Sequence, residues 1–150
     1  MKACEIHEDA LLISDDPARL NREQIHRFLS ERSYWARGVT PEAVNRALDH
    51  SLCFGVYHAG QQVGFARVVT DFATFAWLAD VFIEEGKRRQ GLGKKLIATV
   101  LAHPRLQGLR RFMLGTRDAH GLYARFGFKP LAYPERFMEI HPESSYKCGR

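Results

Sequence analysis

The chain is short of cysteine and has no long apolar run, and each shortage excludes a class of protein. Its 150 residues contain three cysteines, Cys4, Cys53 and Cys148, which are widely spaced and odd in number. They form no CxxC pair and no Cys/His cluster, so we expect reduced thiols and no metal site. No apolar run approaches the roughly 20 residues that span a bilayer, and the first residues lack the apolar stretch of a secretory signal. The sequence therefore predicts a cytoplasmic protein with no membrane partner.

Hydrolase signatures are absent as well. The sequence has no GxSxG elbow, and none of its seven histidines lies in a pattern that pairs a nucleophile with a base. The composition is that of an ordinary globular protein, with 45% hydrophobic and 26% charged residues. A chain of 150 residues is long enough for one hydrophobic core, so we predict a single domain over residues 1–150.

The most informative segment that is present is a basic turn with two glycines, residues 87–95. Five of these nine residues are basic: Lys87, Arg88, Arg89, Lys94 and Lys95. The turn follows an apolar run and precedes apolar residues at helical spacing, so it is predicted to join a strand to a helix. Glycine lets a ligand approach the backbone, and the free N–H groups at a helix start favour an anion. The basic turn therefore predicts a phosphate-binding site.

Two common phosphate-binding patterns do not fit the basic turn. The dinucleotide fingerprint GxGxxG lacks its third glycine, because Leu96 stands at that position. The P-loop pattern GxxxxGK[ST] has the right gap between Gly86 and Gly91, but Leu92 and Gly93 replace the lysine and the hydroxyl residue. A helix entry with glycines for close packing remains the structural alternative.

The order of the predicted elements indicates an α/β fold, or α+β in other schemes. We expect strands at residues 10–13, 52–58, 63–70, 74–84 and 111–115, and a last strand region that begins at 127–128 and closes at 137–140. Helices are expected after the capping residues Asn21 and Thr40, at 92–101 and at 119–126. The turn at Gly60 reads as a hairpin, and hairpins imply antiparallel pairs, so the sheet is predicted to be mixed.

Two motifs occur in a fixed order along the chain. Arg88-x-x-Gly91-x-Gly93 follows a predicted strand, and residues 119–128 read A-H-G-L-Y-A-R-F-G-F. The first looks like the acyl-CoA signature of the GCN5-related N-acetyltransferases, the GNAT superfamily. The second is similar to that family's A-x-x-L-Y-x-x-x-G-F motif. The resemblance extends from the first strand to Phe128, and it implies a mostly antiparallel central sheet flanked by helices on both faces.

The resemblance implies acetyl-CoA as the cosubstrate. Backbone groups of the strand before the turn would pair with the pantetheine arm. Backbone N–H groups of the turn would hold the pyrophosphate, and basic side chains would add charge-assisted bonds. The expected cofactor-binding residues are Val81, Phe82, Ile83, Arg88, Arg89, Gln90, Gly91, Leu92, Gly93 and Lys94.

The activity that the resemblance implies is N-acetyl transfer. A neutral amine would attack the thioester directly and form a tetrahedral intermediate, whose oxyanion a strand N–H would hold. Tyr123 matches the family position of the general acid that protonates the leaving thiolate. A phenol with a pKa near 10 is mostly protonated at neutral pH, so it can donate that proton. The alternative for Tyr123 is a core aromatic on an amphipathic helix.

The general base is left open by the sequence. In relatives that use a glutamate on the long strand, that residue falls about where Trp77 stands here, and Thr116 replaces an asparagine that often contacts the cofactor. Asp80 is the only charge in its apolar strand, so it is either a base or a structural partner of an N–H, arginine or histidine. His120 and Glu84 are further candidates, and water is another.

The acceptor site is predicted in the loop between the first two helices, where relatives often wall their acceptor. Tyr34 and Trp35 would bracket an apolar or cationic acceptor, and Arg37 would pair with an acceptor carboxylate. In the alternative, Trp35 only anchors the loop to the core. Together these residues favour a small-molecule amine over a peptide.

The sequence is also compatible with other functions and with a protein partner. A domain of the same fold that holds acyl-CoA as a sensor without turnover is the main alternative. The net charge of +5 also allows nucleic-acid binding, but the basic residues outside the turn are scattered, so we expect no nucleic-acid partner. Members of the family commonly dimerise, which makes a homodimer possible.

Overall fold

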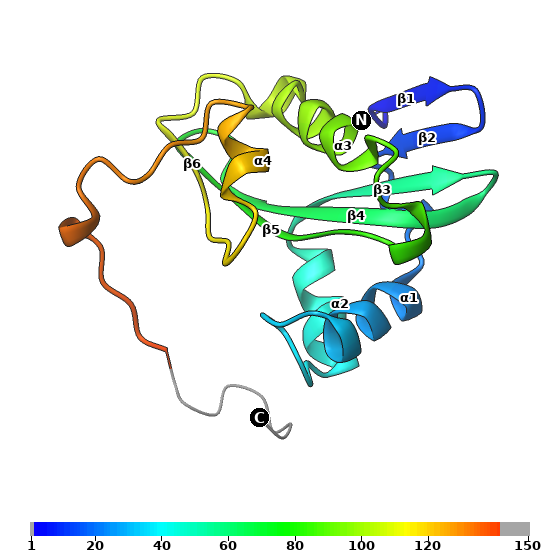
Figure 1. The fold of residues 1–150 in the computed structure, drawn as a ribbon, viewed down its shortest axis with the longest axis horizontal. Helices are drawn as coiled ribbons and strands as arrows, with labels where there is room; N and C mark the ends of the chain where they lie inside the picture. Colours follow the sequence, from blue (N-terminus) through cyan, green and yellow to red (C-terminus); the bar gives the residue numbers. More distant parts are fainter. Residues whose placement is uncertain (1, 142–150) are drawn as a thin grey trace.

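Six strands form one sheet, and their spatial order follows their order in the chain (Figure 1). The computed structural model, which describes residues 2–141, gives their bounds as β1 (Glu5–Glu8), β2 (Leu11–Ser14), β3 (Leu52–His58), β4 (Gln61–Thr70), β5 (Phe75–Ile83) and β6 (Arg111–Leu114). Four of the five pairs are antiparallel, and only β5 and β6 run parallel. The predicted mixed, mostly antiparallel sheet is confirmed.

Two helices begin directly after the predicted capping residues Asn21 and Thr40. The helices are α1 (Arg22–Arg27), a π-helical turn η2 (Phe28–Arg32), α2 (Pro41–Asp49), α3 (Leu92–Leu101) and α4 (His120–Ala124). Single 3-10 turns lie at η1 (Pro17–Arg19), η3 (Glu85–Lys87), η4 (Pro104–Leu106) and η5 (Pro134–Arg136). The side chains of Asn21 and Thr40 accept from N–H groups three residues later, at 3.1 Å each. In residues 2–141 no helix is both long and apolar enough to cross a membrane.

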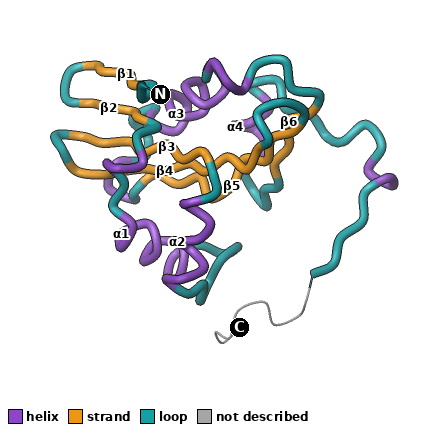
Figure 2. Tube along the Cα trace, turned by 180° about the vertical axis from the view of Figure 1, so that it is seen from behind, coloured by secondary structure: helices purple, strands orange, loops and turns teal. Residues whose placement is uncertain are grey.

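Helices cover both faces of the sheet, as the two opposite views in Figures 1 and 2 show. On one face Leu96 and Ile97 of α3 join a core with Ala66, while the neighbouring Phe65 points to the opposite face. There the helices α1, η2 and α2 pack, and the rings of Phe28 and Phe82 stack with centroids 3.9 Å apart. The predicted flanking of the sheet on both faces is therefore confirmed.

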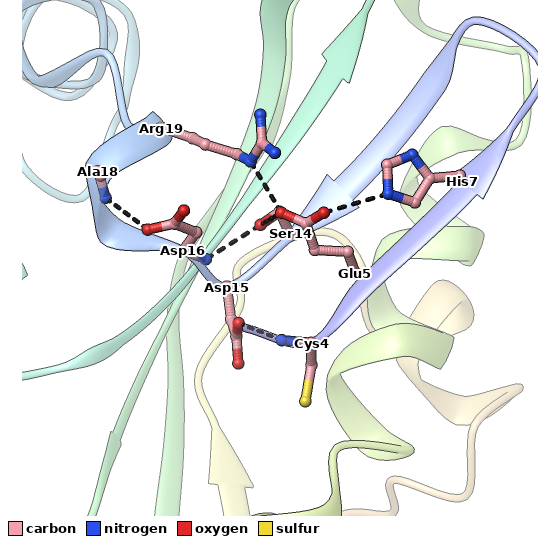
Figure 3. A network of polar contacts seen from close by, with 8 residues as sticks. All are labelled: Cys4, Glu5, His7, Ser14, Asp15, Asp16, Ala18 and Arg19. Atoms are coloured by element: carbon pink, nitrogen blue, oxygen red, sulfur yellow. Dashed lines mark hydrogen bonds and ion pairs between the residues drawn. The ribbon is translucent and has the colours of Figure 1, made fainter. Parts of the chain in front are cut away.

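Strand β1 was not predicted, because it holds a single apolar residue among charged ones. It forms because Glu5 has partners outside its own segment (Figure 3). Its carboxylate accepts from the Ser14 hydroxyl at 2.9 Å and from Arg19 Nε at 2.8 Å. These hydrogen bonds lower the pKa of Glu5, the one from Ser14 most and the one from Arg19 next.

The predicted last strand region is wrong for the described residues. Neither residues 127–128 nor 137–140 form a strand, so β6 stays at the edge of the sheet. Pro130 and Pro134 lie between the two segments, and proline donates no hydrogen bond to a strand ladder. Only Phe128 still packs against the core, 5.9 Å from the Tyr123 ring. Cys148 lies outside the described residues, whereas Cys4 and Cys53 are free thiols.

Candidate active site

Strands β5 and β6 pair over four residues and then separate. Their register joins Phe75 to Arg111 and ends with Leu78 opposite Leu114. From Ala79 to Ile83 the backbone edge of β5 has no strand partner on that side among residues 2–141. An unpaired strand edge offers N–H and C=O groups to an extended ligand. This opening is the splay that the predicted pantetheine contacts of Val81, Phe82 and Ile83 require.

A β-bulge lies at the point where β5 leaves β6. Ala79 pairs with Arg67 and Phe82 with Phe65, so two residues of β5 oppose one residue of β4. Asp80, the first residue of the bulge, has a φ of 55°. A left-handed conformation is uncommon for a residue other than glycine and often marks a functional site. The bulge therefore bends β5 at the point where it separates from β6.

The basic turn forms a hollow of about 350 Å³ beside the end of β5. Arg89 and Gly91 have φ values of 65° and 76°, and Gly91 caps α3 without a side-chain hydrogen bond. The first N–H groups of α3 therefore remain free to bind an anion. The hollow is lined by Ile83, Lys87, Arg88, Arg89, Gly91, Leu92, Gly93, Lys94 and Leu122. Gln90, one of the expected cofactor-binding residues, is absent from this lining, whereas Lys87, which was not among them, belongs to it.

A second, larger cavity of about 510 Å³ lies between the sheet, the turn η2, the helix α2 and the loop that joins them. Its deep wall is apolar and includes Leu29, Val44 and Leu48, while Arg67 and Asp80 supply opposite charges on the sheet side. A cavity with an apolar wall and a few polar groups is typical of a small-molecule site. The two hollows approach each other along β5, since Val81 lines the large cavity and Ile83 the smaller one.

Helix α4 also lies between the two hollows. Tyr123 lines the large cavity and is 8% exposed, while the preceding Leu122 lines the hollow of the basic turn. Burial raises the pKa of the Tyr123 phenol, and the nearby Tyr34 raises it further. The phenol is therefore protonated across the physiological pH range, as a proton donor must be.

Asp80 is bonded through both carboxylate oxygens. One oxygen accepts from Arg67 Nε at 2.7 Å, and the other accepts from the indole Nε1 of Trp35 at 2.8 Å. Arg67 in turn donates to the Ser51 hydroxyl at 3.1 Å. The Arg67 and Asp80 side chains are only 18% and 12% exposed, so this ion pair is poorly screened by water. The arrangement ties the loop of Trp35 to the bulge of β5.

The loop before α2 reaches across the large cavity. Ser33 fixes its start, because its buried hydroxyl donates to Leu29 O at 2.6 Å and accepts from Ala36 N at 3.0 Å. The Tyr34 hydroxyl accepts from Arg117 N at 2.8 Å, and the Arg117 guanidinium lies 3.9 Å from the centre of the Tyr34 ring. Tyr34 and Trp35 thus connect this loop to both sides of the opening. Arg37 is exposed and does not line the cavity.

Tyr34→Phe should loosen the segment before α4 without unfolding the domain. The substitution removes the acceptor of the Arg117 N–H and keeps the ring that the guanidinium covers. We expect the amide of residue 117 to exchange its hydrogen about 3- to 10-fold faster, measured by NMR hydrogen exchange, because one hydrogen bond contributes about 1 kcal/mol. Tyr133→Phe, on a ring that is 52% exposed, is the matched control and should leave this amide unchanged. Equal exchange in both variants would contradict the bridging role of Tyr34.

The other candidate bases are placed less favourably than Asp80. Glu84 accepts from Arg32 and Gln24, and although burial raises its pKa, these hydrogen bonds hold it below the ordinary value. His120 lines neither hollow. Trp77 lines the large cavity but carries no proton acceptor. Thr116 accepts from Ala119 N at 3.1 Å, so it supports the start of α4.

Sequence reasoning missed Arg117, Asp118 and Arg67 among the charged residues that line the large cavity, and a signal in the sequence could have found Arg67. It is the only charge inside β4, and the argument that singled out Asp80 in β5 applies to it equally. Their ion pair links the two neighbouring strands. Several apolar wall residues of α2 were predicted as helical but not as lining a cavity.

A cluster of three potential metal ligands lies away from both hollows. Donor atoms of Cys4, Asp15 and His103 lie within 4.8 Å of one another. His103 Nδ1 accepts from Arg105 N, so its Nε2 carries the hydrogen and donates to Asp15 at 2.8 Å. Burial raises the pKa of the Cys4 thiol, and Asp15 raises it further. These protonation states suit a hydrogen-bonded structural cluster, because a metal needs the lone pair and the thiolate.

This chain is similar to acetyltransferases in sequence and in structure. The Acetyltransferase (GNAT) family profile matches residues 13–128. A protein of Gibberella zeae, provisionally named an acetyltransferase, is 33% identical over 136 residues, with 76% of each chain covered. A provisionally assigned GNAT acetyltransferase of Xanthomonas campestris is 48% identical, with a TM-score of 0.90 over 95% of this chain and 100% of that one. A GNAT acetyltransferase of Elizabethkingia anophelis, solved with acetyl-CoA bound, shares the fold at 15% identity, with a TM-score of 0.62 and 94% of each chain covered.

Proposed function

Because the chain belongs to the GNAT family of acetyltransferases and is an acyltransferase, we propose that it transfers the acetyl group of acetyl-CoA to an amine of a small molecule or peptide. The observation that carries this proposal is the meeting of two hollows at the free edge of β5. One hollow is basic and rich in free N–H groups, and the other has an apolar wall and a few polar groups. A donor with phosphate groups and an organic acceptor would then meet beside Val81 and Tyr123.

The residues of the basic turn fit the phosphate end of acetyl-CoA. A Cβ built on Gly91 would meet no atom within 4 Å, and one on Gly93 would meet only Ile83, at 4.0 Å. Internal packing therefore does not require glycine at position 93, and the space above it is open for a ligand. Arg88 donates through Nε to Ile83 O at 3.0 Å, which leaves its terminal N–H groups for a phosphate oxygen. The phosphate-binding site would be completed by the N–H groups at the start of α3 and by the side chains of Arg89 and Lys94.

The chain's own residues supply three actions in the proposed reaction. When bound, acetyl-CoA supplies a thioester as the source of the acetyl group. A backbone N–H at the bulge of β5 would polarise its carbonyl oxygen. Tyr123 would hold a proton at its phenol oxygen and pass it to the departing sulfur. The loop of Tyr34 and Trp35 would orient the acceptor.

Asp80 serves this reaction best as a positioning residue. Its two oxygens already accept hydrogen bonds, one from Arg67 and the other from Trp35. A water molecule in the large cavity would then accept the proton of the incoming amine. The predicted alternative, Asp80 as a general base, requires that an acceptor amine reach a carboxylate that already has two partners.

A thiol-release assay tests the proposal directly. The protein is mixed with acetyl-CoA and with amino acids, polyamines, aminoglycosides or peptides, and free CoA is measured over time. Release that depends on both the protein and one amine class supports acetyl transfer and identifies the acceptor. Binding of acetyl-CoA in calorimetry without release for any amine would instead favour a sensor of the same fold. Salt-sensitive duplex binding that CoA does not compete would favour a nucleic-acid function.

Gly93→Ala should affect stability and donor binding in opposite directions. Alanine stabilises a helix relative to glycine, so we expect the free energy of unfolding to rise by about 0.5–1 kcal/mol. The added methyl points into the hollow of the basic turn, so the KM for acetyl-CoA should rise about 10-fold or more. Urea unfolding and steady-state kinetics measure the two effects. Gly86→Ala, a methyl added beside the turn but outside the hollow, is the control and should leave KM unchanged.

A further inference from the structure

The guanidinium of Arg67 has N–H groups that the described chain does not use. Its Nε donates to Asp80 at 2.7 Å and its Nη1 to the Ser51 hydroxyl at 3.1 Å, but Nη2 donates to no group of residues 2–141. The only fully buried side-chain atom without a partner among these residues is the Tyr57 hydroxyl, so Nη2 is accessible from the cavity that Arg67 lines. A poorly hydrated guanidinium with unused N–H groups is a favourable site for a carboxylate.

The other arginines near this cavity are less suited to hold an anion. Arg117 also lines it, but its side chain is 65% exposed and lies 3.7 Å from the carboxylate of Asp118, which is exposed to the same extent. Exposed charges are screened by water and contribute little binding free energy. Arg37, which the sequence predicts as the partner of an acceptor carboxylate, does not line the cavity. Arg67, at 18% exposed, is therefore the residue that best fits this role.

The helical wall of the same cavity is apolar. Ala43 and Ala47 lie one turn apart on α2 and are partly exposed, while Val44 and Leu48 beside them are each 4% exposed. Residues at this spacing share one face of a helix, so the two small alanine side chains leave room above a continuous apolar surface. No charged side chain of α2 lines the cavity. This wall therefore favours an apolar group of the ligand.

We infer that the acceptor is a free α-amino acid with an apolar side chain, whose carboxylate binds Arg67 and whose side chain packs on α2. The inference rests on the proposed acetyl transfer and names its substrate class. In the register of β4 and β5, Arg67 lies opposite Ala79, two residues before Val81. An α-amino acid carries its amine and its carboxylate on one carbon, so a carboxylate at Arg67 places the amine near Val81, where the thioester is proposed to lie. The negative charge of Asp80 then faces the amino group.

The product of this reaction is an N-acetyl amino acid. The amine nitrogen forms a bond to the acetyl carbon while the bond between that carbon and sulfur breaks. The sulfur takes the proton of the Tyr123 phenol, and the proton of the amine passes to water, from which the phenol is protonated again. Free CoA is the second product.

Calorimetry without turnover tests the carboxylate contact. In the presence of CoA, which carries no acetyl group, the protein should bind L-phenylalanine about 10- to 100-fold more tightly than 2-phenylethylamine, which lacks the carboxylate. Arg67→Met should abolish this preference and leave the affinity for 2-phenylethylamine within about twofold, an outcome that general damage to the fold would not give. The double variant Arg67→Met with Asp80→Asn leaves no unpaired charge, so it gives the same test if the single variant is unstable.

Arg22→Met is the matched control for the carboxylate contact. It breaks the exposed ion pair with Asp49, away from the cavity, and should keep the preference for L-phenylalanine. Equal affinity of the wild type for the two ligands, or no binding of either up to about 10 mM, would overturn the inference. So would a preference that survives both Arg67 variants.

Ala47→Leu tests the apolar wall in the same assay. The larger side chain fills the space over α2, so the affinity for L-phenylalanine should fall about 10-fold while that for L-alanine stays within about twofold. Arg46→Leu adds a leucine at an exposed position of α2 that does not line the cavity, and it should change neither affinity. An equal loss for both amino acids in Ala47→Leu would contradict the placement of the side chain on α2.

Thiol release distinguishes a failure of the inference from a failure of the proposed function. Release of CoA with L-phenylalanine or L-leucine, and about 10-fold less with L-glutamate or L-lysine, supports both. Release only with amines that lack a carboxylate, such as polyamines, supports acetyl transfer and overturns the inference. Binding of L-phenylalanine that depends on Arg67, with no release for any amine, supports the amino-acid site and contradicts acetyl transfer.

Discussion

Tyr123→Phe should lower kcat by about 10- to 1000-fold while the KM for acetyl-CoA stays within about twofold. The substitution removes the phenol proton and keeps the ring, which is 8% exposed and packs against Phe128. The departing thiolate then has no nearby donor, so the loss falls on the chemical step. Because burial raises the pKa of Tyr123, the wild-type enzyme should keep its activity until the pH exceeds about 10, and the variant should lack that alkaline decline. Steady-state kinetics across pH measure both effects.

Tyr57→Phe is the matched control for this prediction. Tyr57 is also buried, but its hydroxyl has no hydrogen-bond partner among the described residues, and it lines neither hollow. Removing it should leave kcat unchanged and the stability equal or slightly higher, since an unpaired buried hydroxyl costs free energy. If Tyr123→Phe behaves like this control, Tyr123 is only a core aromatic.

Asp80→Ala should lower the free energy of unfolding by about 3 kcal/mol. The substitution leaves the Arg67 guanidinium, 18% exposed, without its carboxylate, and breaking a buried ion pair on one side is strongly destabilising. It also frees the indole of Trp35 from the bulge. Urea unfolding measures the loss. Asp49→Ala breaks the exposed pair with Arg22 and should cost less than about 1 kcal/mol, so equal losses in the two variants would contradict the prediction.

A second pair of variants separates the positioning role of Asp80 from a role as general base. Replacing both partners, with Arg67→Met and Asp80→Asn, should recover most of the stability, because no desolvated charge is left unpaired and asparagine tolerates the left-handed conformation at position 80. If Asp80 only positions other groups, the double variant should retain measurable turnover, and the acidic limb of its pH–rate profile should be the same as that of the wild type. A general base would lose that limb and about 100-fold or more of kcat in Asp80→Asn, which retains an oxygen for Trp35.

The elements that local chemistry controls could be predicted from the sequence. Asn21 and Thr40 cap the helices that follow them, and Gly91 starts α3 in the left-handed conformation that the basic turn requires. The parts that depend on distant partners could not. Strand β1 exists because Glu5 meets Arg19, and the cavity contains Arg67 because a bulge in β5 brings Asp80 to it. The pattern of apolar and polar residues within a single segment cannot predict these two pairings, because each joins residues of different segments.

At the C-terminal segment the error is the reverse: a strand was predicted there and does not form. Its pattern of apolar residues predicts a strand, and Phe137 to Ile140 is a plausible one by composition. A strand, however, needs a partner ladder, and residues 137–140 have none within residues 2–141. The pattern of apolar residues indicates that the segment is able to form a strand, but it does not identify the strand with which the segment would pair.

The division of the site between two stretches of chain has a consequence for how such an enzyme changes. The hollow of the basic turn is lined mainly by residues 83–94, and the large cavity is lined in part by residues 34–39. Substitutions in one stretch leave the other intact, apart from the shared contacts of β5 and α4. With the roles proposed above for the two hollows, substitutions in the shorter stretch should change the acceptor while the donor stays the same, and grafting that stretch onto a relative would test this.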